Sequence, residues 1–147
     1  MLTRKELIGE IGENIVKDVL GGTLSENKYD SIKDLVLNDG TFIEVKTQPR
    51  WQKYQCFTLD DGYNETNLKK CQNVDRLIFV EPTLQGRILL FEAPEKSQRN
   101  FNIIYAGRNK RFCLDVNTCK IIHVYENKEL NDLLISLSNT PKRFITP

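Results

Sequence analysis

The sequence predicts a mixed α/β (α+β) domain in which a mixed central β-sheet is flanked by helices. Three features support this prediction: a helical repeat of apolar residues near the start of the chain, two β-rich runs separated by Asn38-Asp39-Gly40, and later apolar runs that end in an amphipathic segment. A length of 147 residues is typical of one domain, and 39% hydrophobic residues are enough for a core. We therefore expect a single domain over residues 1–147, with a core at about 1–92 and an elaboration at 100–140.

The first helix is expected over residues 4–20. Thr3 and Glu6 have the spacing of a capping box, in which each side chain caps a backbone N–H group of the other residue. Gly21-Gly22 provides the stop, because glycine readily adopts the conformation that ends helices. Between these signals the apolar residues recur at helical spacing, at Leu7, Ile8, Ile11, Ile15, Val16, Val19 and Leu20.

A β-hairpin is expected next. Two β-rich runs joined by Asn38-Asp39-Gly40 are a strong hairpin signal. If these residues form a three-residue loop with Gly40 left-handed, then Leu37 lies opposite Thr41. The same register places Asp34 opposite Glu44.

Shorter apolar runs predict the remaining elements. A last amphipathic helix is expected to carry Leu130, Leu133, Leu134 and Leu137 on one face. Strands are expected near residues 22–25, 54–59, 76–81, 87–92, 101–105, 111–116 and 120–125, with a short helix over 64–71.

Composition limits the classes of protein. A net charge of +1 argues against a protein that coats DNA non-specifically, so any DNA contact is expected to use local basic patches. No apolar run approaches the length that a bilayer requires, and no apolar stretch near the start indicates a secretory signal, so we expect a cytoplasmic protein with no membrane partner. In that compartment the cysteines are expected to be buried thiols. They are Cys56, Cys71, Cys113 and Cys119.

Several catalytic classes are disfavoured. His123 is the only histidine and lies in an apolar run, which argues against hydrolases that depend on catalytic histidines. The chain also lacks a G-x-S-x-G motif, a Walker P-loop and a G-x-G-x-x-G motif.

The informative tripeptide is Glu44-Val45-Lys46. Glu-x-Lys occurs three times in the chain, so the pattern alone says little. Glu26-Asn27-Lys28 and Glu126-Asn127-Lys128 lie in turn-like surroundings, whereas Glu44-Val45-Lys46 ends an apolar strand that pairs with an acid. Lys46 shares a face with Glu44, because side chains alternate along a strand.

Asp34, Glu44 and Lys46 predict metal-dependent phosphodiester hydrolysis. Directly opposed strand residues have Cβ atoms roughly 4.5–5.5 Å apart, so two carboxylates there repel each other. A bridging Mg²⁺ or Mn²⁺ ion would relieve this repulsion, since these ions prefer carboxylate ligands. The reaction needs a metal, an activated water and stabilisation of the leaving oxygen, and the Lys46 ammonium suits either of the last two roles.

The pattern Asp34-x9-Glu44-Val45-Lys46, with an acidic helix upstream, resembles the PD-(D/E)XK nuclease superfamily, which includes restriction enzymes, Holliday-junction resolvases and some homing endonucleases. The resemblance implies a restriction-endonuclease-like core that runs helix, strands, helix, strand. It also implies DNA as substrate, with Mg²⁺ or Mn²⁺ held by Asp34, Glu44 and the Val45 carbonyl, and with Lys46 as a catalytic residue.

The resemblance extends to the first helix. Residues 9–13 are similar to the G-x-x-G-E-like context that many members place there, which implies Glu13 as a further catalytic and metal-binding residue. No proline precedes Asp34, and Asp30 has the same strand parity, although the register favours Asp34. Second choices for the site are therefore Asp30, Glu10 and Gln48, the last of which extends the strand as in several branches of the superfamily.

Two basic segments are candidates for contact with DNA, because cations mixed with aromatic or polar residues are typical of nucleic-acid-binding loops. The candidates are Arg50, Trp51 and Lys53 in the first segment and Arg108, Lys110 and Arg111 in the second.

The predicted function is a site- or structure-specific DNA endonuclease from a mobile or phage-like context. A homodimer or higher symmetric oligomer is expected, because cutting both strands of a duplex needs two active sites. Two alternatives stay open: a catalytically inactive nucleic-acid-binding module of the same fold, and an exonuclease. The sequence does not select the DNA substrate.

Overall fold

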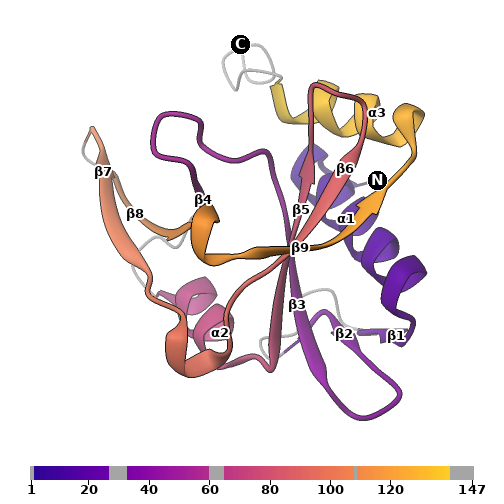
Figure 1. Cartoon of the computed structure of the whole chain (residues 1–147), viewed down its shortest axis with the longest axis horizontal. Coiled ribbons are helices and arrows are strands. Elements are labelled where there is room, and N and C mark those ends of the chain that lie inside the picture. The colour runs from indigo at the N-terminus through magenta and orange to yellow at the C-terminus, as the bar shows by residue number, and fades with distance from the viewer. Residues whose placement is uncertain (1, 27–32, 60–64, 108, 140–147) are drawn as a thin grey trace.

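The computed structural model describes residues 2–26, 33–59, 65–107 and 109–139. Within these ranges the chain forms three layers (Figure 1). Helices α1 (Arg4–Leu20) and α3 (Lys128–Asn139) cover one face of a six-stranded sheet, and α2 (Thr66–Asn73) covers the other face together with a three-stranded sheet. This arrangement confirms the expected mixed α/β class, with a mixed central sheet flanked by helices.

The large sheet has the strand order β1-β2-β3-β5-β6-β9. β3 and β5 are parallel, and the other neighbouring strands are antiparallel. β9 joins the sheet beside β6, so the C-terminal third of the chain contributes a strand to the main layer. The strands are β1 (Thr23–Leu24), β2 (Leu35–Val36), β3 (Phe42–Thr47), β5 (Arg76–Pro82), β6 (Ile88–Glu92) and β9 (Lys120–Tyr125).

The small sheet has the order β4-β8-β7. The sequence predicted its three strands near their observed positions, but it did not predict that they form a sheet of their own. Its strands are β4 (Cys56–Leu59), β7 (Asn102–Ala106) and β8 (Asn109–Asp115), with short 3₁₀ turns η1 (Lys96–Gln98) and η2 (Val116–Thr118) nearby in sequence.

The hairpin has the predicted register. Leu35 pairs with Ile43, and the Leu37 N–H donates to the Thr41 carbonyl at 2.9 Å. Gly40 has a φ of +90°, so the left-handed residue that the loop requires is present. The face on which each β3 side chain lies is therefore confirmed.

The helix signals are also confirmed at the start of the chain. The Thr3–Glu6 capping box forms, and Gly21 caps the end of α1 with a φ of +80°. The prediction for α3 is wrong at one position: Leu134 is fully buried, but Leu133 is 44% exposed. Adjacent helical residues lie about 100° apart around the axis, and Leu133 lies at the edge of the apolar face that Leu134 buries.

Alternate side chains of β5 divide the core. Leu77 and Phe79 pack with α2 and the small sheet, whereas Ile78 and Val80 pack with α1 and α3. The cysteines fit this core as expected: Cys56, Cys71 and Cys113 are buried free thiols, and Cys119 is half-buried. His123 is exposed on β9.

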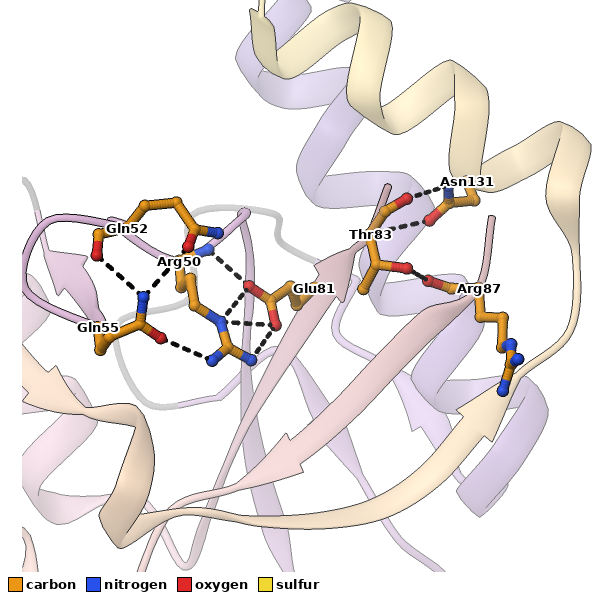
Figure 2. Close-up of polar contacts among 7 residues, drawn as sticks. All are labelled: Arg50, Gln52, Gln55, Glu81, Thr83, Arg87 and Asn131. Carbon is orange, nitrogen blue, oxygen red and sulfur yellow. Dashed lines mark hydrogen bonds and ion pairs between the residues drawn. The ribbon is translucent and has the colours of Figure 1, made fainter. Parts of the chain in front are cut away.

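α3 is fastened to the turn between β5 and β6 (Figure 2). The Asn131 side chain accepts a hydrogen bond from the Thr83 N–H and donates one to the Thr83 carbonyl, both at 2.8 Å.

Among the described residues, no helix is long and apolar enough to cross a membrane.

Candidate active site

β3 extends past the end of β2, so among the described residues only the first part of β3 is paired with β2 along this edge. The pairing ends at Leu35 and Ile43, where the Asp34 N–H also donates to the Ile43 carbonyl at 2.8 Å. The Asp34 carboxylate then accepts a hydrogen bond from the Val45 N–H at 2.9 Å. The sequence predicted that Asp34 pairs directly with Glu44 in the ladder, but the ladder ends before these two residues. The Asp34 side chain instead supplies the hydrogen-bond acceptor that a longer β2 would have offered to the Val45 N–H.

Glu44 and Lys46 lie on the face of β3 that is covered by α2. In the parallel register they are neighbours of Leu77 and Phe79, which also face α2. Lys46 Nζ lies 3.0 Å from Glu44 Oε2 and donates to Asn67 Oδ1 at 3.0 Å. Only 2% of the Glu44 side chain is exposed, so the pair lies largely within the protein.

Lys70 joins Asp34 to Glu44. Its Nζ lies 3.1 Å from Asp34 Oδ1 and 2.9 Å from Glu44 Oε1. One ammonium group therefore contacts both carboxylates that the hairpin brings together. The repulsion that was expected to require a divalent cation is already offset by a lysine, so the repulsion alone is no argument for a metal.

The sequence did not identify Lys70 and Asn67 as site residues. Both lie in the predicted helix at a spacing of three residues, which places them on one side of α2. The one nearby signal in the sequence was the apolar residue Cys71, which follows Lys70 and marks the side of α2 that is buried. A lysine at the border of an apolar helix face usually has its ammonium in water, and this masks a buried role.

Arg99 holds α2 in place. Its buried guanidinium donates to the carbonyl oxygens of Cys71, Val74 and Asp75 at 2.7–3.0 Å. The last carbonyls of a helix have no partner within the helix, so these bonds satisfy the end of α2. They fix the helix that carries Lys70.

α1 reaches the site from the other face. A Cβ atom at Gly12 would lie 1.6 Å from Thr47 Oγ1, so only glycine allows this approach of α1 to β3. The next residue, Glu13, is half-buried, and its pKa is raised to about 7, first by burial and then by the Asp34 carboxylate. Glu10 is exposed. Of the two glutamates, Glu13 is the one whose pKa is affected by the charge of Asp34.

The site combines two carboxyl groups, those of Asp34 and Glu44, with two ammonium groups, those of Lys46 and Lys70. Burial raises the pKa of Glu44 to about 7, and the neighbouring Asp34 carboxyl adds to this rise. Burial is the largest influence on both Lys46 and Lys70 and lowers their pKa, but the combined attraction of the neighbouring groups, led by the Glu44 carboxylate and including Asp34, outweighs it, so both pKa values lie above the ordinary 10.5. Both lysines are therefore protonated at neutral pH.

Glu44 Oε1 is a buried carboxylate oxygen, and the Lys70 ammonium lies 2.9 Å from it, so a positive charge already occupies the position where a cation would bind. The Val45 N–H points towards Asp34, and the N–H and C=O of one strand residue point to the same edge, so the Val45 carbonyl also faces this edge.

A hard divalent cation fits these donors. No three His, Cys, Asp or Glu side chains lie close enough together to hold a metal by themselves in the part of the chain that the structure describes. Mg²⁺, however, is commonly bound by one or two carboxylates and keeps several waters. Two carboxylates and the Val45 carbonyl are such a set.

Arg50, a candidate for DNA contact, is engaged within the protein (Figure 2). Its Nε and Nη2 donate to the Glu81 carboxylate at 2.8–3.2 Å, and its Nη1 donates to Gln55 Oε1 at 3.0 Å. Glu81 is 4% exposed, so Arg50 neutralises a buried charge. This ion pair anchors the segment that follows β3.

The other basic candidates are more accessible. Trp51 is half-exposed and packs edge-on against Tyr54, with ring centroids 4.8 Å apart. Lys53 is exposed, with its Nζ 5.3 Å from the centroid of the Tyr54 ring. Lys110 is exposed and pairs with Glu65 at 3.2 Å. Arg111 is half-exposed, and Arg108 and Asp30 lie outside the described residues.

The two basic segments lie at opposite ends of the small sheet. β4 and β8 are antiparallel, with Cys56 opposite Asp115 and Leu59 opposite Phe112. The segment around Trp51 therefore lies at one end of this pair and Lys110 at the other. One short stretch of DNA that contacts a single end of this strand pair therefore cannot contact both basic segments.

Gln48 links the two sheets. Its side-chain amide donates to the Thr58 carbonyl at 2.8 Å and accepts from the Thr58 N–H at 2.9 Å. Gln48 thus extends β3 towards β4, and its amide is used in this link.

Comparison with known proteins found no family model that matches this chain and no match among curated proteins.

Proposed function

We propose that this chain is a Mg²⁺- or Mn²⁺-dependent DNA endonuclease of the PD-(D/E)XK type. One observation carries the proposal: Asp34 and Glu44 converge on one cation-sized position beside β3, with Lys46 on the same face as Glu44. The element order also supports it, because α1, β1 to β4, α2 and β5 follow the helix, strands, helix, strand order of the core that the resemblance implies, with β4 in the small sheet.

The chemistry follows from the roles of these residues. Asp34, Glu44 and the Val45 carbonyl would hold the metal, which supplies the positive charge that neutralises the phosphate. Lys46, fixed by Asn67, orients the attacking water or stabilises the developing negative charge. Glu13, with a pKa of about 7, is suited to take up a proton at neutral pH.

DNA contact is proposed for the accessible basic residues. Arg50 is left out of this surface, because its guanidinium neutralises Glu81. A symmetric homodimer in the cytoplasm would supply the second active site that a double-strand cut needs. The proposed DNA-contacting residues are Trp51, Lys53, Lys110 and Arg111, with Arg108 as a sequence-based candidate.

The reaction class is tested with a panel of DNA substrates. The protein is incubated with Mg²⁺ and linear duplex, single-stranded, flap or four-way-junction DNA. Discrete internal products from one substrate support an endonuclease, whereas progressive shortening from the ends indicates an exonuclease. Binding without cleavage of any substrate would favour the inactive nucleic-acid-binding module.

Lys46→Ala tests the assignment of the site. This variant should lose cleavage and keep DNA binding. Lys128→Ala is the matched control, because it removes the lysine of another Glu-x-Lys tripeptide, Glu126-Asn127-Lys128, whose side chain is 79% exposed. The control should cleave like the wild type. Cleavage by Lys46→Ala at the wild-type rate would show that Lys46 has no catalytic role.

A further inference from the structure

Lys70 occupies a position that a bridging metal ion would take. Its ammonium contacts one oxygen of each carboxylate, Asp34 Oδ1 and Glu44 Oε1. Only 10% of the Lys70 side chain is exposed, so this is an internal contact and not a surface pair. A cation that bound the same two oxygens would lie against the ammonium, and like charges at that distance repel strongly in a partly buried site.

Lys46 stands in a different relation to the carboxylates. It contacts the other Glu44 oxygen, Oε2, and is tied to Asn67. A metal at Glu44 Oε1 therefore leaves room for Lys46 to stay, but not for Lys70. The two lysines are distinguishable by experiment.

We propose that Lys70 is an internal counter-cation, which fills the metal position in the metal-free protein and is displaced when a divalent cation binds. The inference rests on the proposed function, since it takes Asp34 and Glu44 as the metal ligands. In the metal-free protein Lys70 compensates the buried Glu44 carboxylate. After displacement the ammonium stays tethered to α2 beside the site, where its three donors suit a phosphate oxygen.

Calorimetric titration of Mg²⁺ into the DNA-free protein tests the competition. Lys70→Gln should bind Mg²⁺ more tightly than the wild type, on the order of tenfold, because the ion no longer has to break two ion pairs. Lys69→Gln is the matched control: it removes the same charge from the next residue of α2, which is exposed, and should leave the affinity unchanged. Unchanged or weaker binding by a folded Lys70→Gln protein would overturn the inference.

A second measurement uses the wild type and does not depend on the folding of a variant. Lysines are acylated with a small amine-reactive reagent, with and without Mg²⁺, and each site is quantified by mass spectrometry. Mg²⁺ should increase the labelling of Lys70 severalfold and leave Lys69 unchanged. Labelling of Lys70 that is constant or slower in a protein with Mg²⁺ bound would overturn the inference.

The outcomes separate this inference from the proposed function. A protein that binds no Mg²⁺ overturns both. Mg²⁺ binding without any change at Lys70 overturns only the displacement. Displacement of Lys70 in a protein that cleaves no DNA supports the inference and overturns the nuclease proposal.

Discussion

Gly12 on α1 and Thr47 on β3 approach each other so closely that a Cβ atom at Gly12 would lie 1.6 Å from Thr47 Oγ1 and 2.8 Å from Thr47 Cβ. Glycine inside a helix costs about 0.5–1 kcal/mol relative to alanine, so the helix itself does not favour this residue. The close approach of α1 to β3 accounts for it, and that approach brings Glu13 towards the site.

Gly12→Ala should destabilise the protein by about 1–3 kcal/mol, because the added methyl group forces α1 away from β3. Gly9→Ala is the matched control on the same helix, where the nearest atom to an added Cβ is Glu13 Oε2 at 4.0 Å. That variant should be neutral or slightly stabilised. Urea denaturation measures both, and equal stability of the two variants would contradict the packing argument.

Arg50→Met should destabilise the fold by about 3 kcal/mol, since it leaves the Glu81 carboxylate buried without its partner. Arg87→Met is the control: Arg87 pairs with Glu126 at 4.0 Å, both side chains are more than half exposed, and the expected loss is under about 1 kcal/mol. Denaturation midpoints give the comparison. A stable Arg50→Met protein with weakened DNA binding would instead restore Arg50 as a DNA contact.

The metal-free protein should lose stability as pH rises from about 4.5 to about 7. Burial raises the pKa of Glu13 and Glu44 from 4.5 to about 7, so the folded state binds protons more tightly than the unfolded state. This contribution is complete below pH 4.5 and disappears as pH passes through about 7. In EDTA, the fall in urea midpoint between about pH 5 and about pH 8 should be larger for the wild type than for Glu13→Gln. An equal fall would show that Glu13 does not titrate in this range.

Asp34→Asn and Glu44→Gln should each weaken Mg²⁺ binding by more than about tenfold, since even residues that only support metal ligands contribute that much. Asp39→Asn is the control: Asp39 is an exposed acid of the same hairpin, and its acceptor for the Thr41 N–H is retained. Calorimetry measures the affinities. Because Lys70 offsets the repulsion between Asp34 and Glu44, Asp34→Asn is not expected to stabilise the metal-free protein. Unchanged affinity in both variants would place the metal elsewhere.

The local part of the site could be predicted from the sequence. Asn38-Asp39-Gly40 fixes the hairpin register, and the alternation of side chains then places Glu44 and Lys46 on one face. The contact between Asp34 and the Val45 N–H could not be predicted, because it depends on where β2 ends. Hydrophobic pattern gives the position of a strand, but its end is decided by local hydrogen bonding.

The long-range part could not be predicted. Lys70 follows the exposed Lys69 and has the sequence context of a solvated charge, yet α2 packs so that its ammonium lies between two acids. Arg50 looks like part of a nucleic-acid-binding loop, but its partner Glu81 lies 31 residues later in an apolar strand. A single sequence contains no pattern that pairs such distant charges.

The strands of the large sheet stand in the order in which the chain presents them, β1-β2-β3-β5-β6-β9, and only the small sheet is set aside from this series. A ribosome releases the N-terminal part first. Each new strand of the large sheet therefore meets an edge that its predecessor has left open, and none has to be inserted between two strands that are already paired. Asp34, Glu44 and Lys70 all precede β5 in the chain. The residues of the candidate site therefore leave the ribosome before the last third of the chain, whereas Arg99 and the small sheet, which hold α2 in place, follow them.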